Sequence, residues 1–369
     1  MSTLGVLRIG TRGSALALAQ AEYVRELLGA PPDREIEIVV VPVSGDRDAD
    51  GEDRSRGDKS RWVDAIEDAL LAGEIDLAVH SAKDVPGELA DGLALLGAPR
   101  RAAVEDVVCI GAHSAKSWVG SSPGARDSGE PTGLEALPTG ATVGTSSVRR
   151  TAQLRAVRAD LNIVTLGGNV DTRLRKLATE DLDAIVIARA GLQRLGRESE
   201  IGAVLDPARF VPAPGQGALA LEARAGDARV ADAVRAILDA DTSACLLAER
   251  SLASGLDASC HTPLGAHAVP AGCGCLGLRA WVGLPDGSAW IADQLAETGM
   301  RAEGECLPAS VGGFYDPTAL GGRVAARMRA AGADELLTKA GRHASSSSSS
   351  SPVGVPRFGQ RDEMTGSHV

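Results

Sequence analysis

The chain has 369 residues, enough for two or three domains of ordinary size, and 44% of them are hydrophobic while only 2% are aromatic. A core of this composition has to rely on Ala, Val, Leu and Ile, which is typical of α/β proteins. The formal net charge of −11 argues against a general binder of nucleic acid or of membrane surfaces. No apolar run reaches about eighteen residues and no signal-peptide pattern occurs, so we expect no transmembrane helix and a cytoplasmic location.

The first part of the chain predicts two helices and two strands. A helix is expected over residues 16–28, with Ser14 as its N-cap, and β-branched runs predict strands over 36–41 and 77–79. Between the two strands, apolar residues recur at helical spacing until Gly73 ends the pattern, namely Trp62, Val63, Ile66, Ala69 and Leu70.

The middle of the chain continues this alternation. Strands are predicted over 141–144, 161–166 and 184–188, with helices over 148–158 and 172–178 between them. The resulting βαβαβ order predicts a mainly parallel sheet that is covered by helices.

Three segments interrupt the pattern. Residues 42–60 almost lack apolar side chains and predict a solvated loop, which between a strand and a helix can also act as a lid over a site. Residues 112–135 are rich in Gly, Ser and Pro and predict a loop insertion. The tail, residues 341–369, contains a long run of serines, and we expect it to be disordered.

The cysteines form no C-x-x-C pair, and the closest two, in GCGC, have a spacing that makes a poor zinc site. For each cysteine the first interpretation is therefore a small buried thiol. We expect neither a metal site nor disulfides in a cytoplasmic chain. The cysteines are Cys109, Cys245, Cys260, Cys273, Cys275 and Cys306.

Hydroxyl and cationic side chains gather where the predicted strands end. Ligands of parallel sheets bind beyond these ends, where helix N-termini attract anions. Each turn alone is equally well explained by helix caps and solvated arginines, but several together favour a ligand with several carboxylates. Phosphate is less favoured, since neither G-x-x-x-x-G-K-[ST] nor G-x-G-x-x-G occurs in the required context. The turns are Thr11 to Ser14, His80 to Pro86, Gly144 to Arg150 and Gly167 to Arg173, followed by Arg189 and Arg194.

A set of motifs over about residues 7–335 carries a resemblance to a known family. HSxKDxP, GTSSxRR and GNVxTRL are together highly specific, and on them the chain resembles the porphobilinogen deaminases, also called hydroxymethylbilane synthases. The motifs read, in order, RIGTRGSALALAQ, VHSAKDVP, VGTSSVRRTAQL, GNVDTRLRKL, AGLQRLG, PAPGQGALALE and ASCHTPLGA.

The resemblance implies an α/β fold with three domains. Two lobes built like those of periplasmic binding proteins would face each other across a cleft, and a smaller third α/β domain would carry a cofactor cysteine. Lobe 1 would comprise residues 1–101 and 218–235, and lobe 2 residues 102–217, including the insertion. The cofactor-attachment domain would comprise residues 236–340, before the tail.

The resemblance also implies the reaction, a transferase step of tetrapyrrole and heme biosynthesis. The family joins four porphobilinogen molecules head to tail into hydroxymethylbilane and releases ammonia at each condensation. A dipyrromethane that is never released primes the reaction, and the matching position for its thioether bond is Cys260. Porphobilinogen would be the small-molecule partner of a monomeric protein, and neither a metal nor an external coenzyme is implied.

The predicted binding residues follow from the charge of the substrate. Each porphobilinogen carries an acetate and a propionate, so a growing chain of pyrroles needs many cationic and N–H donors. The matching family positions imply that Arg12, Ser14, Arg173 and Arg194 bind substrate and that Lys59 belongs to the lid. Positions matched to cofactor binding are Lys83, Thr145, Ser146, Ser147, Arg149, Arg150 and Arg173.

Asp84 is an acid among bases, and the resemblance makes it the predicted catalytic residue. Loss of ammonia leaves an azafulvene whose positive charge lies largely on the pyrrole nitrogen. A carboxylate that is hydrogen-bonded to pyrrole N–H groups stabilises this charge where it develops, and it can also relay protons. The residues alone leave open a structural salt bridge between Asp84 and a neighbouring arginine.

Two departures from the family pattern leave other functions open. The family usually has Arg where this chain has Gly167, and Gly where the lid has Asp58. Arg189, or a lid arginine such as Arg54 or Arg56, could compensate. One alternative is therefore a homologue that binds pyrroles with little or no turnover, and another is a deaminase of a specialised pyrrole pathway.

Overall fold

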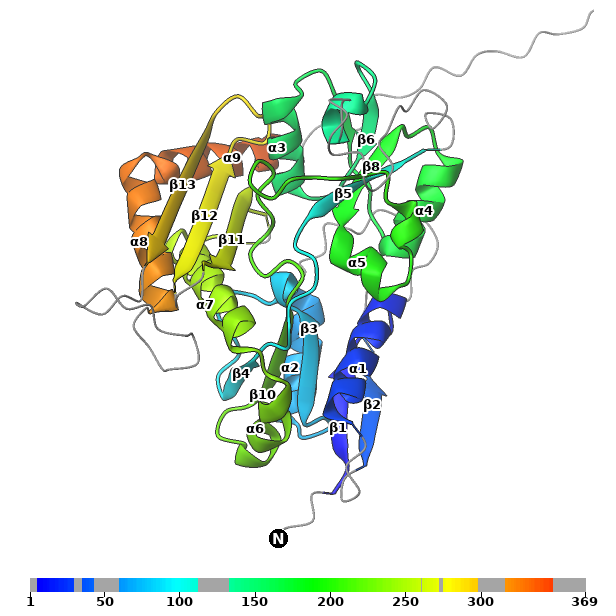
Figure 1. The fold of residues 1–369 in the computed structure, drawn as a ribbon, viewed down its shortest axis with the longest axis vertical. Helices are drawn as coiled ribbons and strands as arrows, with labels where there is room; N and C mark the ends of the chain where they lie inside the picture. Colours follow the sequence, from blue (N-terminus) through cyan, green and yellow to red (C-terminus); the bar gives the residue numbers. More distant parts are fainter. Residues whose placement is uncertain are drawn as a thin grey trace, which may run out of the picture.

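The described part of the chain forms three sheets, two of five strands and one of three. Figure 1 shows the two larger sheets one above the other, with the smaller sheet beside the upper one. This arrangement confirms the expected α/β fold of two lobes and a smaller third domain. The computed structural model describes residues 5–29, 35–42, 60–111, 133–259, 261–271, 275–297 and 316–347.

Lobe 1 consists of β1 (Leu7–Thr11), α1 (Ala15–Leu28), β2 (Ile36–Val40), α2 (Ser60–Leu71), β3 (Leu77–Ser81), β4 (Leu93–Gly97), β10 (Leu219–Arg224) and α6 (Ala228–Val234). Its strand order is β2-β1-β3-β10-β4. The sheet buries apolar side chains on both faces, against α1 and α6 on one side and α2 on the other.

Lobe 2 consists of β5 (Asp106–Ile110), β6 (Thr142–Gly144), α3 (Val148–Val157), β7 (Asn162–Val164), α4 (Val170–Thr179), β8 (Ala184–Ala188), α5 (Arg189–Arg194) and β9 (Ala203–Val204). Its strand order, β7-β6-β8-β5-β9, repeats that of lobe 1 position by position. In each sheet four strands run in one direction, and the remaining strand, β10 or β5, runs antiparallel to both of its neighbours.

The antiparallel strand of each lobe enters from the other lobe. The first crossover, residues 98–105, leads from β4 of lobe 1 to β5 of lobe 2, and the second crossover, residues 205–218, leads from β9 back to β10. The three strands predicted in the middle of the chain do pair in parallel, and the one antiparallel strand of each lobe makes its sheet mixed. The local βαβ pattern could not reveal a strand that pairs with a segment so far away in the chain.

The third domain is an antiparallel sheet with helices packed against it. Strands β11 (Leu264–Pro270), β12 (Leu276–Gly283) and β13 (Trp290–Glu297) share one apolar core with α7 (Ala240–Gly255), α8 (Pro317–Ala330) and α9 (Ala333–Ser347). The predicted disordered tail starts too early, because α9 continues through its first seven residues, and residues 348–369 lie outside the described residues.

Local sequence signals place several helix ends where they were expected. The Ser14 hydroxyl accepts a hydrogen bond from the Ala17 N–H at 3.3 Å and caps α1. After α2 the chain turns through Gly73, whose φ of 71° favours glycine. Of the two predicted loops, residues 43–59 and 112–132 lie outside the described part. None of the described helices is long and apolar enough to span a membrane.

A buried carboxylate of the third domain joins both crossovers. Glu249 of α7 is fully buried and accepts hydrogen bonds from both Arg101 Nη atoms, at 2.7 and 2.9 Å. It also accepts the backbone N–H groups of Gly215 and Ala268, each at 2.7 Å. Since Arg101 lies in the first crossover and Gly215 in the second, a single side chain fastens both connections between the lobes to the third domain.

We predict that Glu249→Gln lowers the free energy of unfolding by about 3–5 kcal/mol, because it leaves the Arg101 guanidinium buried without a countercharge. Urea denaturation of the variant and of the wild type measures the difference.

The matched control is Glu135→Gln. Glu135 pairs with Arg209 at 3.4 Å, and both side chains are more than half exposed. An exposed pair contributes about 0–1 kcal/mol, so this control should unfold almost like the wild type. Equal losses in the two variants would contradict the special role of Glu249.

Candidate functional site

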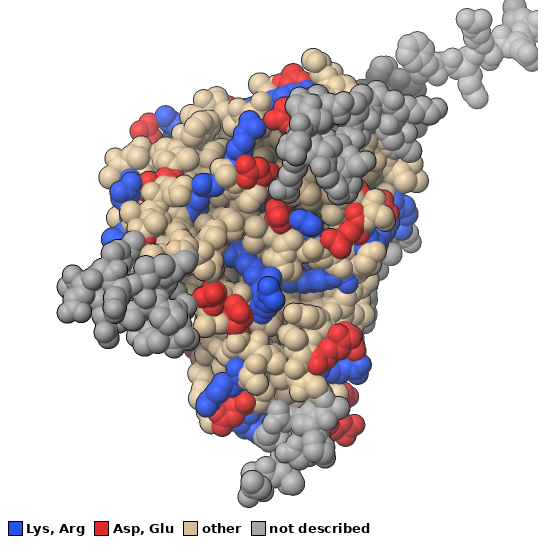
Figure 2. Space-filling model, viewed as in Figure 1, with Lys and Arg blue, Asp and Glu red and all other residues tan. Residues whose placement is uncertain are grey.

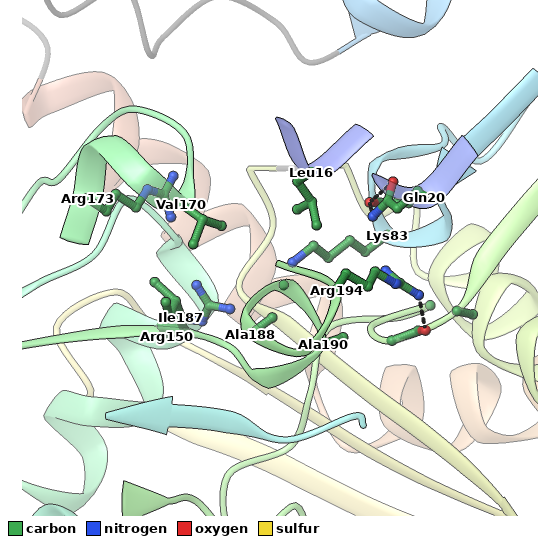
Figure 3. A pocket seen from close by; sticks show the side chains of 15 residues that line it. Leu16, Gln20, Lys83, Arg150, Val170, Arg173, Ile187, Ala188, Ala190 and Arg194 are labelled. Atoms are coloured by element: carbon green, nitrogen blue, oxygen red, sulfur yellow. Dashed lines mark hydrogen bonds between the residues drawn. The ribbon is translucent and has the colours of Figure 1, made fainter. Parts of the chain in front are cut away.

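A pocket lies between the two lobes, at the carboxyl ends of their parallel strands (Figure 3). Lobe 1 contributes α1, the end of β3 and the 3-10 turn η1 (Ala82–Asp84). Lobe 2 contributes the first turns of α3 and α4 together with β8 and α5, and the second crossover closes the remaining side. The lining residues are Leu16, Gln20, Ser81, Lys83, Arg150, Val170, Arg173, Ile187, Ala188, Ala190, Gly191, Arg194, Gly215, Gly217 and Ala218.

Four cationic side chains line this pocket, Lys83 from lobe 1 and Arg150, Arg173 and Arg194 from lobe 2. In Figure 3 the Lys83 side chain extends toward the side of the pocket where Arg150 and Arg173 lie. Figure 2 shows Lys and Arg side chains gathered near the middle of the molecule, although its net charge is negative. The lining residues include no carboxylate, so the pocket attracts anions.

Arg173 is held in place by its own lobe. Its Nε donates to the Gly168 carbonyl at 2.8 Å, and its Nη2 donates to the Ser146 hydroxyl at 2.9 Å. Burial and repulsion from Arg150 lower the pKa of Arg173 to about 10, while attraction to Asp84 opposes the shift. The guanidinium therefore stays charged at neutral pH, and bound carboxylates would compensate the cost of its burial.

Arg194 connects α5 to the second crossover. Its Nη2 donates to the Gly217 carbonyl at 2.7 Å, which fixes the side chain across the pocket. Burial lowers the pKa of Arg194 to about 10, and Tyr23 of α1 opposes this shift from the lobe 1 side. Arg194, a residue of lobe 2, is thus influenced electrostatically by Tyr23 of lobe 1.

The adjacent arginines of the GTSSVRR motif have different surroundings. The two oxygens of the fully buried Asp106 accept from Arg149 Nη2 at 2.7 Å and from Arg150 Nε at 2.9 Å. Arg149 also donates to the Val211 carbonyl at 2.8 Å and does not line the pocket, whereas Arg150 does. Burial opposes the ionisation of Asp106, but both arginines outweigh it and lower the pKa of Asp106 to about 2.

The hydroxyls of the same motif mainly organise the start of α3. Ser147 caps the helix by accepting the Arg150 N–H at 3.4 Å, and Thr145 Oγ1 accepts the Ser147 N–H at 3.2 Å. Asn169 caps α4 in the same way, by accepting the Thr172 N–H at 2.8 Å. Two helix N-termini therefore begin at this end of lobe 2, where their dipoles favour anions.

Sequence reasoning missed the apolar part of the pocket wall. Leu16 of lobe 1 and Val170 of lobe 2 both lie close to Gly191, where a Cβ atom would be 3.8 Å from Leu16 and 3.4 Å from Val170. Sequence reasoning also missed the contact of Gln20 with Ser81, in which the amide donates to the hydroxyl at 2.8 Å. Ser81 and Val170 lie in predicted turns after strand ends, which was the available signal for them. Leu16 and Gln20 lie in the predicted helix over 16–28, where nothing in the sequence distinguishes them from other helix residues.

The remaining predicted site residues are distributed as follows. Ser14 caps α1, and Arg12 and Asp84 are half-buried without lining this pocket. Asp84 follows Lys83 in η1 and attracts the Arg173 guanidinium electrostatically. Lys59 and Cys260 lie outside the described residues, as do the lid residues 54, 56 and 58.

Two cysteines away from the pocket match the expectation of buried thiols. Burial raises the pKa of both Cys109 and Cys245 to about 12, so neither is a thiolate at neutral pH. Among the residues described, no group of three or more His, Cys, Asp or Glu side chains could hold a metal ion.

Solved structures give only a weak similarity. The periplasmic VFT2 domain of Bordetella pertussis BvgS covers 67% of this chain and 92% of its own, with 17% identity and a TM-score of 0.36. The Bacillus subtilis ytmK, described as a probable extracellular-binding protein of an amino-acid ABC transporter, covers 63% and 89%, with 11% identity and a TM-score of 0.36. Scores this low support no further inference about this chain.

Sequence comparisons are much more informative. The family model "Porphobilinogen deaminase, dipyromethane cofactor binding domain" matches residues 7–232, and "Porphobilinogen deaminase, C-terminal domain" matches residues 243–330. The porphobilinogen deaminase of Deinococcus radiodurans is 41% identical over 332 residues, which are 89% of this chain and 97% of the relative. That of Leifsonia xyli subsp. xyli is 42% identical over 341 residues, 90% and 94% of the two chains. The chain belongs to the porphobilinogen deaminase family.

Proposed function

We propose that this chain condenses four porphobilinogen molecules into hydroxymethylbilane in the pocket between its lobes, with release of ammonia. Membership of the family gives the activity. The observation that supports the location is the convergence of four cations from both lobes on a pocket whose lining lacks carboxylates. We expect the protein to act as a cytoplasmic monomer.

The pocket combines the two chemistries that a carboxylated pyrrole requires. Arg173 presents a guanidinium group to acetate and propionate side chains, and Lys83 adds an ammonium group from the opposite lobe. Arg150 lines the pocket as well, but Asp106 and the Val186 carbonyl already accept hydrogen bonds from its guanidinium group. The apolar side chains of Leu16 and Val170 lie close enough to the cations to pack against a pyrrole ring.

The family's dipyrromethane fits the same residues. It carries carboxylates, and the half-buried cations Arg173 and Arg194 have no carboxylate among the other lining residues. We propose that Lys83, Arg150 and Arg173 hold its carboxylates and that Cys260 provides its sulfur attachment. When bound, the cofactor supplies the acceptor pyrrole for the first condensation.

Asp84 is the proposed catalytic residue. Its carboxylate lies in the turn after β3 and attracts Arg173. From this position it can accept hydrogen bonds from pyrrole N–H groups and stabilise the positive charge that develops when the substrate loses ammonia. The same carboxylate can take up the proton released when the new bond forms.

The alternative function, a homologue that binds pyrroles with little turnover, rests on Gly167, which stands where the family usually has an arginine. The proposed compensation by Arg189 receives no support, because Arg189 pairs with Glu105 at 3.3 Å and approaches Glu198 at 3.8 Å. Arg189 does not line the pocket, and its guanidinium group interacts with the carboxylates of Glu105 and Glu198 instead.

The proposed attachment of the cofactor makes a direct prediction. Protein purified from cells that make porphobilinogen should have an intact mass greater than the bare chain by one dipyrromethane, and Cys260→Ser should remove the increment. Cys109→Ser is the control and should retain it, because Cys109 is a buried thiol. A wild-type mass equal to that of the bare chain would exclude the covalent cofactor.

We predict that Asp84→Asn keeps the fold but nearly abolishes turnover. The isostere keeps the shape of the side chain and removes the negative charge opposite the developing cation. Loss of one preorganised stabilising group typically costs about 2.7–4 kcal/mol, so kcat should fall at least a hundredfold. Steady-state turnover of porphobilinogen measures the effect, and activity within a few-fold of wild type would make Asp84 a structural residue.

We predict that Gly167→Arg speeds chain elongation. A hydrogen bond to a charged group contributes about 1.5–3 kcal/mol. An added arginine that makes such a bond should therefore raise the rate of elongation by roughly ten- to a hundredfold. Mass spectrometry during turnover should then show fewer partly elongated enzyme–pyrrole species. Slower turnover would mean that another group already fills this space, and no consumption of porphobilinogen by either form would favour the binding homologue.

A further inference from the structure

We infer that Arg250 of α7 is a positioning residue that holds the turn bearing Lys83 and Asp84 in place. The inference concerns contacts between the third domain and lobe 1, and only its kinetic consequence rests on the proposed function. Arg250 is half-buried and lies outside the pocket.

The hydrogen bonds of Arg250 converge on the residues directly after the turn. Its Nη1 donates to the Val85 carbonyl at 3.3 Å, and its Nη2 donates to the Pro86 and Gly87 carbonyls at 2.7 and 3.0 Å. The carbonyls of three successive residues therefore accept hydrogen bonds from the same guanidinium group, which is planar and permanently charged. Because Pro86 has no N–H, this segment cannot make a continuous backbone ladder, and a side chain from another domain holds it instead.

Apolar packing from the same helix supports the turn on its other side. Leu246, about one turn before Arg250 in α7, shares a buried cluster with Ala82 and Val85. These two residues flank Lys83 and Asp84. One face of α7 therefore contacts the turn through both an apolar residue and a guanidinium group.

A buried acid, Glu222, attracts the positive charge of Arg250. Glu222 of β10 is fully buried, and its Oε2 lies 2.9 Å from His80 Nε2. Burial lowers the pKa of Arg250, and attraction to Glu222 opposes this shift. Glu222 contacts His80 in β3, just before the turn, and Arg250 contacts the three carbonyls just after it.

The test compares Arg250→Ala with the matched variant Arg224→Ala. Arg224 also donates to backbone carbonyls, those of Leu70 and Ile75 at 2.7 and 2.8 Å, but at the opposite end of β10 from the cleft. Both variants should lose thermal stability. Only Arg250→Ala should lower kcat, by about tenfold or more, and only it should speed amide hydrogen exchange in residues 82–87.

Chemical rescue separates positioning from general damage. Added guanidinium ion should restore part of the activity of Arg250→Ala and none of that of Arg224→Ala. Arg250→Lys keeps the charge but not the planar fork, so its kcat should be intermediate. If Arg250→Ala does not fold, Arg250→Lys and Arg250→Gln carry the same comparison.

Equal kcat values and equal exchange in the Arg250 and Arg224 variants would overturn the inference. If the wild type itself does not consume porphobilinogen, the proposed function fails, while exchange at residues 82–87 still decides whether Arg250 holds the turn.

Discussion

The hydrogen-bonded pair of Glu249 and Arg101 fixes the geometry on which the pocket depends. The pocket has walls from two lobes, so its width depends on where the two crossovers lie. Glu249 accepts hydrogen bonds from both crossovers and from β11, without a water-exposed atom. In a buried environment such a carboxylate is costly unless every oxygen is satisfied, and here its partners are the segments that must be held. The third domain therefore acts as the frame to which both lobes are attached.

The same design, a buried acid that arranges cations, recurs inside lobe 2. Asp106 holds Arg149 inward and leaves Arg150 facing the pocket. Gln216 of the second crossover donates to the same carboxylate at 3.0 Å, which links the pocket-lining Arg150 to the connection between the lobes. The pocket of a chain with a net charge of −11 is thus cationic because its lining residues include no carboxylate, while the buried Asp106 orients two arginines.

Local patterns predicted much of the fold, and the limits of prediction have physical causes. The cap at Ser14 and the helix starting at Val148 depend on neighbouring residues, so the sequence reveals them. The antiparallel placement of β10 depends on pairing with β3, far away in the chain, and no local signal encodes it. Arg149 and Arg150 look alike in the sequence, but the turn of about 100° between successive helical residues directs them to different surroundings. The roles proposed for Cys260 and Asp84 came from the family resemblance and remain predictions.

The late position of β10 in the chain also has a consequence for folding during synthesis. When β1 to β4 have left the ribosome, the sheet of lobe 1 still lacks β10, and the facing edges of β3 and β4 have unpaired backbone groups. The missing strand arrives only after the whole of lobe 2 has been made. Neither a fragment ending at β4 nor one ending at β9 contains a complete first lobe. Lobe 2, by contrast, is continuous from β5 to β9, so it can be complete before lobe 1, whose sheet has to wait for β10.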